Sequence, residues 1–138
     1  MTDSRAPAGY SGTPLPQKLG IKAGHRVLLA GAPAGFDLGP LPDVEVHRRA
    51  GRTPYDVVLL FCRDLRRLER AFVPLTSRLV TTGGLWVAWP KRSSGVATDL
   101  DENTIRAVGL AAGLVDNKVC AIDATWSGLR FVVRLRDR

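Results

Sequence analysis

The chain has 138 residues, of which 45% are hydrophobic and 24% are charged, and its formal net charge at pH 7 is +7. A chain of this length can bury a core of its own, and no apolar run approaches the roughly 20 residues that a membrane helix needs. No apolar run follows a basic start as in a signal peptide. We therefore expect a cytoplasmic protein without a membrane segment, built from a flexible N-terminus (residues 1–9) and one domain (residues 10–138).

The basic surplus favours an anionic partner, such as nucleic acid, a nucleotide or an acidic protein. The arginines gather mainly in three stretches, at residues 48–52, 63–70 and 134–138. No aromatic residue interleaves with them as a base-stacking surface would require. A GC-rich coding sequence also enriches arginine with no function attached, so the charge alone leaves both explanations open.

Four apolar segments predict strands. Residues 26–30, 55–62 and 85–89 are almost continuously apolar. Continuous rather than alternating hydrophobicity is typical of strands that are buried on both faces of a parallel sheet. Residues 44–46 predict a short strand that lies nearer to an edge of the sheet.

Two short segments carry helix start signals. Residues 14–19 follow Thr13, and threonine is a favoured N-cap residue. Residues 102–112 follow Asp99 and Asp101, either of which could cap the helix.

The longest helical pattern runs from Leu65 to Leu79, where apolar residues recur at alternating steps of three and four. Pro74 is expected to kink or divide this helix, and the glycine pair at residues 83–84 is expected to end it. The opposite face carries the predicted nucleic-acid-binding residues. These are Arg66, Arg67 and Arg70.

The chain closes with predicted strands at residues 118–122 and 129–135, joined by residues 123–128 in the pattern of a β-hairpin. Strands that alternate with helices and then end in an antiparallel pair indicate the α/β class. We predict a three-layer Rossmann-like domain, with a mostly parallel sheet that ends in a C-terminal antiparallel β-hairpin.

This order of elements resembles a shortened class I S-adenosylmethionine-dependent methyltransferase domain. That family has a glycine-rich turn after the first strand, a Gly-Gly turn before a late strand and a closing β-hairpin. The counterparts here are residues 31–35 (GAPAG), residues 83–84 and residues 118–135. The resemblance implies a truncated methyltransferase-like topology.

The chain departs from that family at the positions that hold the cofactor. The family's acid two positions before the first glycine corresponds to Leu29, and its middle glycine corresponds to Pro33, which has no N–H to donate. The acid that holds the ribose hydroxyls corresponds to His47 and Arg48, with Glu45 two residues early. Too few residues then precede the next predicted strand for a crossover helix and a further strand. The sequence therefore disfavours S-adenosylmethionine as the cofactor, leaves any other cofactor open and predicts a degenerate, non-catalytic fold.

The chain from Gly9 onward also resembles a small bacterial family that is filed only as a domain of unknown function. The match rests on long and distinctive strings, and it implies no activity. The strings are GYSGTPL (9–15), KLGIK (18–22), WVAWPK (86–91), SGVATDL (94–100), VDNKVCAID (115–123) and TWSGL (125–129).

Ligands of open α/β sheets bind outside the carboxyl ends of the strands. The predicted sheet gathers glycines, basic residues and hydroxyl groups at that edge, which indicates a small cleft suited to an anion. The candidate ligand-binding residues are Gly31, Pro33, Gly35, Arg63, Lys91, Ser93, Ser94, Asp123 and Trp126. The glycines could instead serve only to turn the strand sharply, and Trp126 could close over a bound ring or cover the end of the sheet.

Other polar groups have simpler explanations. Residues 98–102 carry acids that could bind a cation, but threonine and aspartate before a helix are favoured as caps. Cys62 and Cys120 lie in apolar segments and are predicted to be reduced core thiols rather than nucleophiles. No metal site is predicted from two cysteines and two distant histidines, and no complete catalytic constellation is found.

Three functional hypotheses follow. The first is a non-enzymatic binding or adaptor domain, which captures a protein partner or a small anionic ligand through the strand-end cleft and the loop at residues 91–99. The second is an enzyme or sensor that binds a nucleotide-like or S-adenosylmethionine-like molecule in the same cleft. The third is a basic protein associated with nucleic acid. The sequence favours a non-enzyme and leaves the oligomeric state open.

Overall fold

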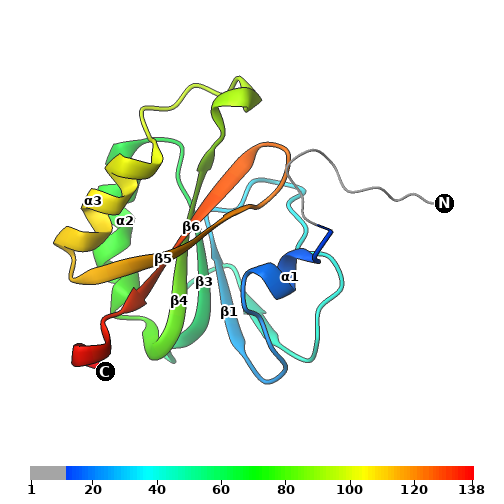
Figure 1. The fold of residues 1–138 in the computed structure, drawn as a ribbon. Helices are drawn as coiled ribbons and strands as arrows, with labels where there is room; N and C mark the ends of the chain where they lie inside the picture. The colour runs from blue at the N-terminus through cyan, green and yellow to red at the C-terminus, as the bar shows by residue number, and fades with distance from the viewer. Residues whose placement is uncertain (1–11) are drawn as a thin grey trace.

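A computed structural model describes residues 12–138, and the predicted flexible segment, residues 1–9, lies outside the described residues (Figure 1). The strands are β1 (Arg26–Ala30), β2 (Glu45–His47), β3 (Tyr55–Phe61), β4 (Leu79–Pro90), β5 (Leu114–Ala121) and β6 (Trp126–Val133). The helices are α1 (Leu15–Lys18), α2 (Leu65–Thr76) and α3 (Glu102–Ala111), with short 3-10 turns η1 (Arg92–Ser94) and η2 (Leu135–Asp137). Within residues 12–138, no helix has the length and apolar character needed to span a bilayer.

All six strands belong to one sheet, in the order β2-β1-β3-β4-β6-β5. β2, β1, β3 and β4 run parallel, whereas β4, β6 and β5 pair antiparallel through a C-terminal hairpin. This arrangement confirms the predicted α/β class and its closing β-hairpin. The chain passes from β1 to β2 and then crosses back to β3 on the other side of β1, so the direction of winding changes between β1 and β3. Residues 48–54 connect β2 to β3 with no helix or strand of their own.

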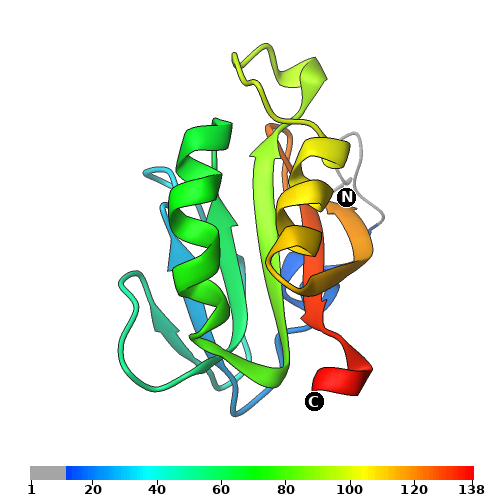
Figure 2. The same cartoon turned by 90° about the vertical axis from the view of Figure 1, so that its left-hand side faces the viewer.

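Both faces of the sheet are covered, and each has its own apolar cluster. α2 and α3 lie side by side over one face, as Figure 2 shows, and they bury Leu68, Phe72 and Ile105 against the strands. α1 and the loop after β1 cover the other face. Successive residues of a strand point to opposite faces, so β4 sends Trp86 to the α1 face and Trp89 to the α2–α3 face.

The prediction of one helix that extends to Leu79 is wrong. α2 ends at Thr76, and Leu79 is the first residue of β4, so the glycine pair at residues 83–84 lies inside this strand. Pro74 lies in the last turn of α2 and does not divide the helix. A Cβ on Gly83 would lie only 2.7 Å from the carbonyl oxygen of Asp56, so the neighbouring strand requires a glycine here. Strand packing, rather than helix termination, explains the glycine pair.

Other boundaries differ from the predictions by less. β1 lies where the sequence predicts it, and β2 is shifted by one residue. α1 begins at Leu15, with Pro14 at the N-cap position and no capping side chain, so the assignment of Thr13 as the N-cap is wrong. Both hairpin strands begin earlier than predicted, and Trp126 is the first residue of β6 rather than part of the turn. The polar side chains at the start of β5 misled the prediction, because β5 is an edge strand with one side open to solvent.

Candidate functional site: a cleft at the strand ends

Two adjoining hollows lie at the carboxyl ends of β1 and β3. The first has a volume of about 320 Å³ and is called the arginine hollow here; its lining residues are Gly31, Pro33, Phe61, Arg63, Asp64, Arg67 and Trp126. The second also has a volume of about 320 Å³ and is called the loop hollow; its lining residues are Pro33, Ala34, Gly35, Phe36, Arg63, Val96, Asp123, Thr125 and Trp126. The hollows share Pro33, Arg63 and Trp126, and together they form the strand-end cleft.

The topology of the sheet creates this cleft. After β1 the chain turns toward the α1 face, whereas after β3 it turns toward α2 on the opposite face. Two neighbouring loops that diverge in this way leave space between them. Ligands of open α/β sheets bind at such a change of winding for this reason.

Gly31 lets a guanidinium group lie close to the turn after β1. Its φ of +72° is a left-handed conformation that residues with a side chain rarely adopt. A Cβ on Gly31 would lie 2.8 Å from Arg67 Nη2 and 3.3 Å from the carbonyl oxygen of Phe61. Gly31 therefore turns the chain sharply and also leaves room for the Arg67 side chain beside the turn.

The arginine hollow contains two guanidinium groups that lack a hydrogen-bonded or ion-paired partner within residues 12–138. The side chains of Arg63 and Arg67 take no part in the ion pairs found there, which involve other arginines. Asp64 is the only acid among the residues that line this hollow. Its Oδ1 accepts the backbone N–H of Arg67 at 2.8 Å and so caps α2. The hollow thus offers charged donors to a ligand, which suits an oxyanion.

The segment before α3 holds the turn that carries Arg63. Thr98 Oγ1 donates to the carbonyl oxygen of Arg63 at 2.5 Å, and Asp99 Oδ1 accepts the backbone N–H of Leu65 at 2.8 Å. Asp101 caps α3, as its Oδ1 accepts a first-turn backbone N–H at 2.8 Å. These contacts confirm Asp101 as the cap of α3, whereas Asp99 binds the first N–H of α2, beside its N-cap residue Asp64. Glu102 is not a cap, because it pairs with Arg106 within α3.

Aromatic side chains form one wall of the cleft. Phe61, at the end of β3, makes an edge-to-face contact with Trp126, with ring centroids 5.0 Å apart and an interplanar angle of 87°. Phe36 packs on the same ring of Phe61 at 4.9 Å. Trp126 is 5% exposed, so it covers the end of the sheet, and it also lines both hollows. Both roles considered for Trp126 from the sequence remain compatible with this position.

Asp123 shapes the turn between β5 and β6. Its Oδ1 accepts the backbone N–H groups of Thr125 at 2.8 Å and of Trp126 at 2.9 Å. Asp123 therefore lines the loop hollow while it holds the first residue of β6 in place.

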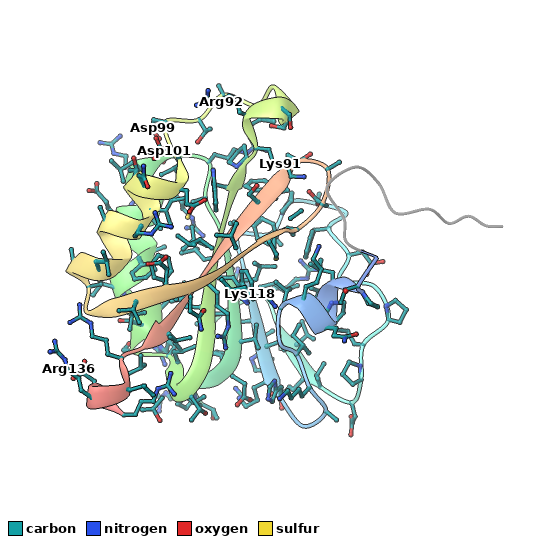
Figure 3. All side chains as sticks on the ribbon, in the orientation of Figure 1. Lys91, Arg92, Asp99, Asp101, Lys118 and Arg136 are labelled. Carbon is teal, nitrogen blue, oxygen red and sulfur yellow. The ribbon has the colours of Figure 1, made fainter. Side chains whose placement is uncertain are left out.

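Three predicted ligand-binding residues lie beside the cleft rather than in it. Lys91, Ser93 and Ser94 line neither hollow. The backbone N–H of Lys91 donates to the carbonyl oxygen of Thr125 at 2.7 Å, and Ser94 Oγ donates to the carbonyl oxygen of Lys91 at 2.6 Å. Figure 3 shows Lys91 at the end of β4, where the chain leaves the sheet toward Arg92. Val96 of the same loop does line the loop hollow.

The structure also separates the arginines of α2. Arg66, Arg67 and Arg70 are all exposed, but of the three only Arg67 lines the arginine hollow, where its guanidinium lies next to Gly31. The sequence places Arg67 on the predicted nucleic-acid surface, and Phe61 and Asp64 were not among the predicted site residues. Phe61 ends a buried strand and Asp64 follows that strand closely, and this position was the signal that could have identified both residues.

The thiols of the chain are not activated. Burial raises the pKa of the Cys62 thiol to about 12, and burial also raises the pKa of the Cys120 thiol. Because the thiolate is the nucleophilic form, both groups are inert at neutral pH, as expected of core thiols. Among residues 12–138, no three His, Cys, Asp or Glu side chains are grouped so that they could hold a metal ion.

The chain matches no protein-family model and no curated protein sequence. Solved structures of S-adenosylmethionine-dependent methyltransferases do share its fold. A SAM-dependent methyltransferase from Aquifex aeolicus superposes with a TM-score of 0.60 at 16% sequence identity, over 86% of this chain and 87% of that chain. Ribosomal protein L11 methylase from Lactobacillus delbrueckii subsp. bulgaricus has a TM-score of 0.57 at 11% identity, over 86% of this chain and 74% of that chain. The N-methyltransferase NodS from Bradyrhizobium japonicum WM9 has a TM-score of 0.54 at 15% identity, over 85% of this chain and 90% of that chain.

These likenesses confirm the predicted methyltransferase-like Rossmann fold. Identities this low show the fold alone and do not transfer an activity. Membership of the small bacterial family stays a prediction, because it rests on the sequence strings only.

The acids that the methyltransferase family uses for its cofactor have no counterparts here. Leu29 is a buried strand residue. Glu45 points to other groups, since its carboxylate pairs with Arg26 Nη1 and His47 Nε2, both at 2.5 Å. His47 in turn contacts the hydroxyl of Tyr55, the first residue of β3, at 2.6 Å, and not the strand-end cleft.

The charges of the arginine hollow do not match the two cationic groups of S-adenosylmethionine, its sulfonium and its ammonium. Asp64 and Asp123, the acids that line the cleft, both use Oδ1 to hold backbone N–H groups. Arg67 places a guanidinium beside the glycine turn, where it would repel a cationic group and attract a carboxylate. The arginines therefore fit only the carboxylate of this cofactor.

Proposed function

We propose that this protein is a ligand-binding domain with a methyltransferase-like fold, and that it takes a small molecule in the strand-end cleft. The observation that carries the proposal is the coincidence of three features at one place. The winding of the sheet changes between β1 and β3, a glycine turn with φ +72° opens the space beside it, and Phe61 and Trp126 supply an aromatic wall. Ligand sites typically combine such a concave apolar wall with a few polar groups.

The proposed role is capture rather than catalysis. The residues that line the cleft include no histidine, cysteine or lysine. Its two acids already hold backbone N–H groups, and the nearby Cys62 thiol has a pKa of about 12. These observations support binding more than an acid–base or nucleophilic reaction. An enzyme or sensor that uses the same cleft is the alternative proposal.

An adaptor function is the second candidate, and a specific feature favours it. The loop at residues 91–99 extends beyond the end of the sheet (Figure 1), and residues 95–97 at its tip are exposed. Val96, 36% exposed, borders the loop hollow. A protein partner docked on this loop would therefore meet the rim of the cleft, so that ligand and partner could influence each other's binding.

Two-dimensional ¹⁵N NMR of the full chain would test the primary proposal. The titration would use a panel of nucleotides, nucleosides and carboxylated metabolites, after native mass spectrometry of gently purified protein to detect a co-purifying ligand. We expect a binder to shift the amide resonances of Gly31 and Gly35 and the indole resonance of Trp126. The indole of Trp86 is the internal control, because its N–H donates to the carbonyl oxygen of Leu19 in the core at 3.1 Å.

The result can contradict the proposal in two ways. A saturable ligand could shift resonances elsewhere and leave those of the cleft unchanged, which would place its site outside the cleft. Alternatively, no compound in the panel could shift any cleft resonance while the loop at residues 91–99 responds to a protein partner. That outcome would leave the adaptor function as the better description.

A further inference from the structure

The charged side chains of the arginine hollow define a class of ligand. The guanidinium groups of Arg63 and Arg67 line one hollow and have no ion-pair partner within residues 12–138. An arginine offers several N–H donors in a planar fork that matches the oxygens of a phosphate or a carboxylate. Two such groups around one small hollow are therefore a receptor for an oxyanion.

The surrounding residues position the segments that carry these donors. Gly31 has no Cβ, and this is what lets Arg67 Nη2 lie beside the turn; a Cβ there would be only 2.8 Å away. Thr98 and Asp99 hold the backbone of the turn that carries Arg63, through bonds of 2.5 and 2.8 Å. Asp99 and Asp64 already accept the backbone N–H groups of Leu65 and Arg67 in the first turn of α2, so the two guanidinium groups are the larger set of donors that remain for a ligand.

The opposite wall defines the rest of the ligand. Phe61 and Trp126 present an edge-to-face aromatic pair, and Pro33 lies between the two hollows. Flat apolar groups pack well on such surfaces. An anionic group beside the arginines and a ring against the aromatic wall would fill both hollows at once.

We infer that Arg67, with Arg63, makes the strand-end cleft of this methyltransferase-like fold selective for small molecules that carry a phosphate or carboxylate on a flat ring, and that Arg67 disfavours the sulfonium and ammonium groups of S-adenosylmethionine. This inference rests on the proposed function, because it assigns the charge and shape of the ligand that the cleft takes. Arg67 is a specificity-determining residue, since its cation favours anions and disfavours a sulfonium at the same position.

Isothermal titration calorimetry of the full chain can test this inference with three probes that share one ring system and differ in charge. The probes are adenosine 5′-monophosphate, which is a dianion, adenosine, which is neutral, and S-adenosylmethionine, which carries a sulfonium and an ammonium cation besides one carboxylate. We expect the monophosphate to bind about 10- to 100-fold more tightly than adenosine, because charged hydrogen bonds to a guanidinium are strong. S-adenosylmethionine should bind more weakly than the monophosphate, because its cationic groups outnumber its carboxylate. Added salt should weaken the binding of the monophosphate more than that of adenosine.

Matched variants separate the arginine hollow from the general basic charge. Arg67→Ala should remove most of the preference for the monophosphate over adenosine. Arg66→Ala is the control, because it removes the same charge from an exposed position of the same helix that does not line the arginine hollow, and it should leave the preference intact. Arg67→Lys keeps the charge without the planar fork and should fall between the two. Thermal unfolding of each variant checks that the fold is unchanged.

The outcomes distinguish this inference from the proposed function. If S-adenosylmethionine binds as tightly as the monophosphate, or if Arg66→Ala and Arg67→Ala weaken binding equally, the assignment to Arg67 is overturned. If adenosine or S-adenosylmethionine shifts the Trp126 indole resonance but the monophosphate does not bind, the anion selectivity fails and the cleft remains a ligand site. If no probe produces heat or shifts a cleft resonance, the inference is overturned and the proposed function loses its support as well.

Discussion

Gly109 in the last turn of α3 is the position where a conservative change should have the opposite effect from the usual one. Replacing a helical glycine by alanine normally stabilises a protein by roughly 1 kcal/mol, because alanine loses less backbone entropy on folding. Here a Cβ would lie 2.6 Å from Cζ of Phe131 and still nearer to other atoms of that ring. Phe131 is fully buried and packs edge-to-face on Phe72 at 5.3 Å, so its ring has little space to withdraw.

The expected magnitude follows from these opposing effects. Overpacking of a well-packed core costs typically 1–3 kcal/mol, occasionally more, and the helix-propensity gain offsets roughly 1 kcal/mol of it. A Cβ on Gly109 would overlap three atoms of the buried Phe131 ring, which places the cost in the upper part of that range, about 2–3 kcal/mol. We therefore expect Gly109→Ala to lower the free energy of unfolding by about 1–2 kcal/mol. For a chain of this size that corresponds to a fall in Tm of roughly 3–8 °C.

Urea unfolding of Gly109→Ala, followed by circular dichroism, measures this change directly. Ala107→Gly is the control, because Ala107 is exposed on the same helix and should lose about 1 kcal/mol through helix propensity alone. The same Gly109→Ala change in a Phe131→Leu background should cost less, because the smaller side chain relieves the overlap. An increase in stability on Gly109→Ala in the wild-type background would refute the argument that α3 approaches β6 through this glycine.

Three further predictions concern groups outside the cleft. Tyr55→Phe should lower the free energy of unfolding by about 1–3 kcal/mol in urea unfolding, because the buried hydroxyl contacts His47 Nδ1 at 2.6 Å and accepts the N–H of Gly51 at 2.9 Å; an unchanged midpoint would show that the hydroxyl is not needed. The hydrogen bond with His47 lowers the pKa of Glu45, so its contribution to stability should be present above the ordinary carboxyl pKa and lost as the pH falls through the lowered value. Glu45→Gln should flatten that acidic part of the stability curve, and a curve identical to wild type would argue against the pairing. Burial raises the pKa of Cys62 to about 12, so the native thiol should react with iodoacetamide far more slowly at pH 8 than it does in urea, and equal rates would contradict its burial.

The fold creates the strand-end cleft, and a few side chains determine its chemistry. The sheet order and the glycine turn produce a cleft at the same kind of position that open α/β sheets use for ligands. The polar chemistry of the arginine hollow comes from three side chains, those of Arg63, Asp64 and Arg67. Arg67, in the first turn of α2, adds a cation beside the glycine turn without any change of topology.

Local patterns determined much of the architecture from the sequence alone. The apolar runs of β1 and β3 and the Asp101 cap of α3 depend on contacts within a few residues, and each was predicted at or close to its observed place. The parallel sheet and the closing hairpin follow from the order of such elements. The candidate residues Gly31 and Arg63 could be found in the same way, because they directly follow predicted buried strands.

Contacts between distant segments decided the rest, and no local pattern reports them. The sequence predicts that Gly83 ends a helix, but Gly83 lies within β4. A glycine is needed there because the backbone of β3 passes 2.7 Å from where its Cβ would be. The periodicity of α2 places Arg67 with the solvent-facing arginines, whereas its guanidinium lies in the cleft because a glycine 36 residues earlier in the chain leaves space for it. Helical spacing determines only which side chains share a face. Which face meets the end of another strand depends on how α2 packs on the sheet, and so the tertiary structure alone brought Arg67 to the site.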